Sequence, residues 1–234
     1  MRNLVFIALL AATIASGAKA ETYAAELDQL AAKSDLNDLI KRVNQPRSVE
    51  EVRVGLNWLR AKSIESFGGS RIHYSYALGL FRANVKETAT FAFLYGLLAG
   101  RIDASRCADP SAPGEKLQRW EQSLGSIFLH FQSLSLDERR KLVSMAIATE
   151  EQFSARAPDT WLCSGGLVFM HKFMEKHKDD PSPPAREIQD GTRPGRTILL
   201  DDPAIKPEFV TDEEWNIKRK QLASKFSEQL LAAK

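Results

Sequence analysis

The stretch TATFAFLYGLLAGRIDASRC, residues 88–107, decides the expected fold. It holds no charged residue from Thr88 to Gly100, and its large apolar side chains fall on more than one face of a helix. A helix that is apolar nearly all round is usually buried. The run is shorter than the roughly 20 apolar residues that cross a membrane. We therefore predict that Lys86 to Gly100 forms the central helix of a helical core.

The rest of the chain has the same helical character. Apolar residues recur three and four positions apart in successive segments, and convincing strand alternation is lacking. Three capping boxes, in which a serine or threonine precedes a glutamate by three residues, mark helix starts at Ser48, Ser135 and Thr211. We expect an all-α fold, either an antiparallel helical bundle or stacked helical hairpins, with a Pro-rich arm and a C-terminal helix.

Several local expectations can be checked against a structure. Asn84 should break the chain before the central helix, and Gly79 should allow close packing of the preceding one. One continuous helix is expected over Glu115–Leu134. Met145 should be buried in the helix that follows Ser135. Thr160 should cap a helix whose apolar side comprises Trp161, Leu162, Leu167, Val168, Met170, Phe173 and Met174.

The first 20 residues have the pattern of a secretory signal peptide. Arg2 is followed by an apolar run from Leu4 to Ile14, and Ala18-Lys19-Ala20 fits the small-x-small cleavage rule. A buried N-terminal helix is the alternative. We expect cleavage after Ala20 and a soluble mature protein in the periplasm or outside the cell.

That compartment bears on the two cysteines, Cys107 and Cys163. In an oxidising space, two cysteines of one chain most often form a disulfide. We predict this bond, and a loop of this length gives roughly 4 kcal/mol in the chain-entropy description. The alternative is a nucleophilic Cys163 with a histidine base, which requires a free thiolate.

After the predicted signal peptide, composition divides the chain into three parts. We expect a helical domain over residues 21–178, a Pro-rich linker or arm over 179–210, and an amphipathic helix over 211–234. Thr197–Leu200 could form a short extended piece. The last helix should carry an apolar stripe formed by Trp215, Leu222, Phe226 and Leu230. We expect this stripe to pack back on the bundle; the alternative is that it binds a partner protein.

Charge argues against nucleic acid as a partner. The chain has 32 basic and 30 acidic residues, a formal net charge of +2. Arg2 and Lys19 lie in the predicted signal peptide, so the mature chain is neutral. Nucleic-acid binders need a basic surface. No second segment after the signal peptide is long and apolar enough for stable membrane insertion.

Candidate chemistry is sparse. The chain has four histidines, and they lack the spacings typical of zinc sites: His73, His130, His171 and His177. His171 and Glu175 lie four apart and could share a metal, but a solvated pair explains them equally well. A haem ligated by His171 with Met170, Met174 or Met145 would fit the residue types, although no CxxCH motif is present.

Two further features were considered as sites. Phe67–Arg71 could hold an anion on consecutive backbone N–H groups, or it could simply connect two helices. Glu150 and Glu151 are adjacent and therefore point apart on a helix, so they do not form a catalytic pair.

The expected function is that of a non-catalytic protein that binds another protein. The alternative is a small-molecule, metal or haem binder in the helical core. An enzyme would require the fold to gather residues such as His73, His130 and Glu150. We assign no catalytic, cofactor-binding or metal-binding residue from the sequence, and no feature indicates an oligomeric state.

Overall fold

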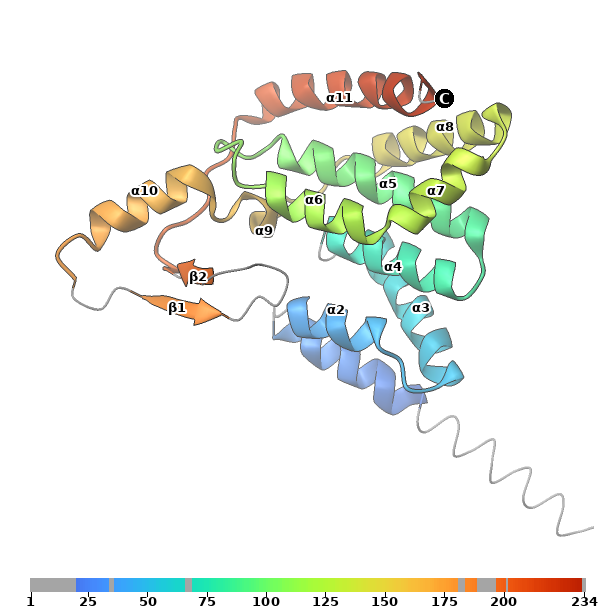
Figure 1. The fold of residues 1–234 in the computed structure, drawn as a ribbon, viewed down its shortest axis with the longest axis horizontal. Helices are drawn as coiled ribbons and strands as arrows, with labels where there is room; N and C mark the ends of the chain where they lie inside the picture. Colours follow the sequence, from blue (N-terminus) through green and yellow to red (C-terminus); the bar gives the residue numbers. More distant parts are fainter. Residues whose placement is uncertain are drawn as a thin grey trace, which may run out of the picture. The chain divides into compact units, whose positions relative to one another are not determined.

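The computed structural model describes residues 20–33, 36–65, 69–180, 184–188, 197–200 and 202–232. The predicted signal peptide up to residue 19 lies outside the described residues. So do residues 34–35 and 66–68, the latter including part of the candidate anion-binding segment Phe67–Arg71. Figure 1 shows that the described chain is almost entirely helical, with one two-stranded hairpin.

The observed elements confirm the all-α fold. Residues 20–32 form a first helix. The following helices are α2 (Leu36–Asn44), α3 (Val49–Ile64), α4 (Ser70–Arg82), α5 (Lys86–Ala104), α6 (Gly114–Ser123), α7 (Gly125–Ser133), α8 (Leu136–Gln152), α9 (Thr160–Cys163), α10 (Gly166–Lys176) and α11 (Asp212–Ala232), with strands β1 (Ala185–Ile188) and β2 (Thr197–Leu200) between α10 and α11.

The chain forms two compact units that interleave along the sequence. The first unit runs from the N-terminus to Gly100 and also takes in Trp120–Arg156 and the chain from Lys225 onward. The second unit comprises Arg101–Arg119 and Ala157–Ser224. Helices α5, α6 and α11 therefore each contribute residues to both units.

Helix α5 is buried on all sides, as predicted. Leu94 and Leu98 are completely or almost completely buried, and so are the small residues Ala89 and Ala99. The helix begins at Lys86, where the sequence placed it, but continues to Ala104 rather than ending at Gly100. Asn84 adopts a positive φ of 61°, which confirms the expected break before it.

Close packing in the first unit depends on two glycines. A Cβ at Gly79 of α4 would lie 2.8 Å from Leu56 Cδ2, and one at Gly96 of α5 would lie 2.9 Å from His73 Cβ. Glycine therefore lets α4 approach both α3 and α5. Beside this contact lies an apolar cluster formed by the first helix with α2, α3 and α4: Tyr23, Leu27, Leu39, Val43, Trp58, Leu59 and Ile72.

Two predicted helices are each divided. The helix expected over Glu115–Leu134 is interrupted at Leu124, a fully buried residue with φ −106° and ψ 14°. The helix expected after Thr160 ends at Cys163, because Gly165 and Gly166 adopt φ values of 77° and 83° that a continuing helix does not allow.

The three predicted capping sites are confirmed as caps. Ser48 and Ser135 accept hydrogen bonds from backbone N–H groups three residues on, and Thr211 does the same for Glu214 N. The reciprocal bond of a full box forms at Ser135. Before α9, Asp159 is the cap, in place of the predicted Thr160, because its carboxylate accepts from Trp161 N and Leu162 N.

In the second unit, the segment after the hairpin is tied to the loop after α5. Ala108 N donates to Glu208 O at 3.0 Å, and Val210 N donates to Arg106 O at 2.9 Å. Trp215 of α11 is 5% exposed and donates its indole N–H to Ile102 O at 3.1 Å. The buried Trp215, Phe226 and Leu230 confirm that α11 packs on the protein itself.

The extended piece expected at Thr197–Leu200 is strand β2. It pairs antiparallel with β1, so that Ala185 lies opposite Leu200 and Ile188 opposite Thr197. This hairpin was not predicted, because four-residue strands carry too few alternating positions to stand out from a loop.

Candidate functional site

The structure brings the two cysteines to bonding distance. The sulfur atoms of Cys107 and Cys163 lie 2.01 Å apart, and neither cysteine is free. Both side chains are buried with Leu117 and Leu162 in a small apolar cluster of the second unit. This placement excludes the alternative of a thiolate nucleophile at Cys163 in the disulfide-bonded protein.

His73 occupies a buried position in the first unit. Its ring lies edge-on to Tyr95, with centroids 4.7 Å apart, and only 5% of the residue is exposed. The contact exists because Gly96, next to Tyr95, lets α4 and α5 approach closely. Burial, and to a lesser degree the positive charge of Arg156, lowers the pKa of His73 from 6.5 to about 3. His73 is therefore neutral in the folded protein at neutral pH.

Glu150 and Arg156 form a buried ion pair in the same unit. Arg156 Nη1 lies 2.9 Å from Glu150 Oε1, and the two side chains are 5% and 1% exposed. Arg156 also donates to the carbonyl oxygens of Phe153 at 3.2 Å and Ala99 at 3.4 Å. The guanidinium thus joins the end of α8 to α5.

The cluster that an enzyme would require forms only in part. His73 and Glu150 both interact with Arg156, whereas His130 contacts Phe81, with ring centroids 6.1 Å apart. A substrate could not reach His73 or Glu150 while the helices stay packed, and neither residue lines the two pockets described below. We interpret this polar cluster as a packing element of the core.

The buried His73 makes stability depend on pH. Between about pH 6.5 and pH 3 the unfolded chain binds a proton at this histidine and the folded chain does not, so stability falls as the pH falls. The expected slope is about 1.4 kcal/mol per pH unit from this group. Urea unfolding between about pH 6.5 and pH 5, above the range in which most carboxylates titrate, measures it.

Two variants test the assignment of that slope. His73→Phe should remove it, whatever its effect on absolute stability. His130→Gln, at a half-buried position, is the control for the removal of a histidine. An equal slope in wild type and His73→Phe would contradict the prediction.

The residues considered for a metal or haem lie at the surface. Met145, Met170 and Met174 are 42%, 45% and 65% exposed, and His171 and Glu175 are exposed. The prediction that Met145 is buried is therefore wrong, because it lies on the outer side of α8. These residues do not form a haem site inside a helical core.

The candidate anion-binding segment Phe67–Arg71 is described only from Gly69 onward. Gly69 has a positive φ of 57°. Arg71, which we placed beside it, is buried in α4 with 6% exposure. It is therefore not presented to solvent as an exposed anion-binding side chain.

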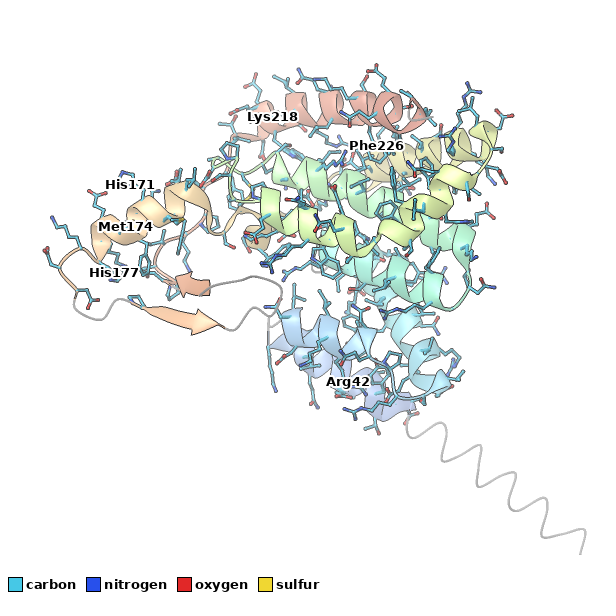
Figure 2. All side chains as sticks on the ribbon, viewed as in Figure 1. Arg42, His171, Met174, His177, Lys218 and Phe226 are labelled. Carbon is cyan, nitrogen blue, oxygen red and sulfur yellow. A yellow bond between two sulfur atoms is a disulfide. The ribbon has the colours of Figure 1, made fainter. Side chains whose placement is uncertain are left out.

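Helix α10, on which Figure 2 labels Met174, carries several exposed apolar side chains in the second unit. Of the apolar side predicted for it, Phe173 is buried at 4% exposure. Four large apolar side chains instead face solvent, and we call them the α10 face: Leu167 at 67%, Val168 at 45%, Met170 at 45% and Met174 at 65% exposure. Scattered apolar side chains are normal on a surface, whereas several on one short helix make that helix a candidate for an interaction site.

Polar contacts fix α10 in place. Asp109 Oδ2 accepts from Val168 N at 2.8 Å, and Ser111 Oγ accepts from Leu167 N at 2.8 Å, so the loop after α5 caps the helix. At the other end, Asp202 is held by Lys176 at 2.7 Å and by His177 Nε2 at 2.9 Å. These bonds hold the pKa of the Asp202 carboxyl well below its usual value. The α10 face is thus carried on a helix anchored at both ends.

Two of the pockets in the described part of the chain are small. One borders α10 and is lined by residues such as Phe169, Lys172 and Glu208, with a volume of about 80 Å³. The other lies between α3 and α4 beside Gly79 and measures about 120 Å³. Pockets for organic ligands usually measure about 300–1,000 Å³, so neither fits a molecule of that size.

Comparison with known proteins gives no assignment: no family model matches the chain, and neither a curated protein nor a solved structure matches it. Among the described helices, none has both the length and the apolar character needed to span a bilayer.

Proposed function

We propose that this chain is an exported, non-catalytic helical protein that binds another protein through the α10 face. The observation that carries the proposal is the exposure of Leu167, Val168, Met170 and Met174 on one helix. Export is supported by the signal-peptide pattern of residues 1–20 and by the disulfide, a bond typical of oxidising compartments.

The chemistry of the face suits a protein partner. Leucine and valine give apolar area whose removal from water drives association. The two methionines have flexible, polarisable side chains that adapt to different apolar surfaces. The expected partner is an exported protein that presents an apolar patch or the apolar side of a helix.

Point substitutions are the appropriate test, because deleting residues 179–234 would remove Trp215 and Phe226 from the buried core. Leu167→Gln with Val168→Gln keeps the fold but places two amides in the interface. The double variant should weaken partner capture at least about tenfold, since interface anchors are each worth more than about 1 kcal/mol. Capture after chemical cross-linking of the exported protein, followed by a titration with the captured partner, measures the loss.

Ile217→Gln is the matched control. Ile217 is 55% exposed on α11 and lies outside the α10 face. Its substitution should leave partner affinity unchanged, and all variants should unfold at the same urea concentration as wild type. If the double variant captures the partner as well as the control does, the α10 face is not the binding surface.

A further inference from the structure

Three side chains with soft or borderline donor atoms lie together on α10. Met170 and Met174 are four residues apart, and His171 and Met174 are three apart, so both pairs are neighbours on the helix surface. All three side chains are exposed. Figure 2 places His171 and Met174 on this helix.

Helix geometry places these donors on one side of α10. Side chains on an α-helix lean toward its N-terminus, so the Met174 side chain leans over the turn that carries Met170 and His171. Methionine has three rotatable side-chain bonds, which let the two Sδ atoms adjust around a bound ion. His177 lies at the end of the same helix, but its ring nitrogens face Asp202 at 2.9 Å and Asp180 at 3.3 Å.

The donor set selects a class of ion. Thioether sulfur binds soft monovalent ions such as copper(I), and imidazole nitrogen also binds copper, whereas calcium and magnesium require oxygen ligands. Within the described residues, no three His, Cys, Asp or Glu side chains are grouped to hold a metal. Zinc, which prefers histidine, cysteine and carboxylate ligands, is therefore not favoured here.

We infer that Met170, His171 and Met174 form a binding site for a soft monovalent cation, copper(I) or silver(I), through two thioether sulfurs and one imidazole nitrogen. This site goes beyond the proposed function, although it shares two methionines with the α10 face. The two roles are separable by substitution. Leucine keeps the apolar volume of methionine but lacks the sulfur donor.

The test is a titration of the exported, disulfide-bonded chain with silver(I) in chloride-free buffer. Silver(I) needs no reductant, so the disulfide between Cys107 and Cys163 stays intact. The ε-methyl signals of methionines labelled with carbon-13 report each thioether. One equivalent of silver should shift the signals of Met170 and Met174 and leave Met145 unshifted, although Met145 is exposed to a similar extent at 42%.

Substitutions complete the test. Met170→Leu with Met174→Leu should abolish the one-equivalent binding, and His171→Asn should weaken it by about tenfold, while Met145→Leu leaves it unchanged. Partner capture is tested separately, with Leu167→Gln and Val168→Gln, which leave all three donor side chains in place. Equal shifts of Met145 and Met174, or unchanged binding in the double leucine variant, would overturn the metal site without affecting the proposed protein interface.

Discussion

Replacing Glu150 with glutamine should lower the free energy of unfolding by about 3–5 kcal/mol, the usual cost of removing one partner from a buried ion pair. The Glu150 carboxylate is 1% exposed and balances the Arg156 guanidinium at 2.9 Å. Glutamine has nearly the same shape but no charge, so the loss measures the electrostatic balance rather than a cavity. Urea denaturation of the disulfide-bonded chain measures the change.

The neighbouring residue gives the matched control. Glu151 follows on the same helix but is exposed, and Glu151→Gln should change stability by less than about 0.5 kcal/mol. Combining Glu150→Gln with Arg156→Met removes both charges and should recover part of the loss. Equal stabilities of Glu150→Gln and Glu151→Gln would show that the ion pair contributes nothing.

Replacing both Cys107 and Cys163 with serine should cost about 4 kcal/mol. The bond spans 56 residues of sequence, and a loop of this length restricts the unfolded chain strongly in the chain-entropy description. The serine side chains also introduce hydroxyl groups into a buried cluster. Urea denaturation with and without a reductant measures the contribution.

Adding a reductant distinguishes the effect of losing the disulfide on stability from the effect of the serine side chains. Wild type should lose most of the stabilisation when reduced, whereas the double serine variant should not respond to the reductant. A wild type whose unfolding is unchanged after complete reduction would contradict the expected contribution of the disulfide.

Much of the helical architecture was predictable from local chemistry. The apolar run before Gly100, the capping serines at 48 and 135 and the break at Asn84 each reflect the preferences of a few adjacent residues. The break at Leu124 was not predictable in this way. The apolar side chain of Leu124 fits the helical pattern of the residues before and after it. The helix is interrupted there in the folded protein, where Leu124 is fully buried, and burial is not visible in the sequence.

The candidate site was less predictable than the fold. Apolar residues occur nearly all round α10, so the pattern does not indicate that Phe173 is buried while Leu167 and Met174 are exposed. That distinction depends on the partners of the helix, Asp109 at its start and Asp202 at its end, which are distant in sequence. Likewise, the sequence marked His73 as a candidate residue but could not show its burial against α5 beside Gly96.

The interleaving of the two units constrains when the protein can fold. The first unit begins near the N-terminus but includes residues from Lys225 onward, where Phe226 and Leu230 are buried. A chain that is synthesised N-terminus first cannot complete that unit until the residues from Lys225 onward have appeared. Until then, the unit lacks the buried side chains of Phe226 and Leu230. Incompletely buried apolar surface exposes a nascent chain to aggregation. Chaperones that bind the incomplete chain should therefore raise the yield of native protein.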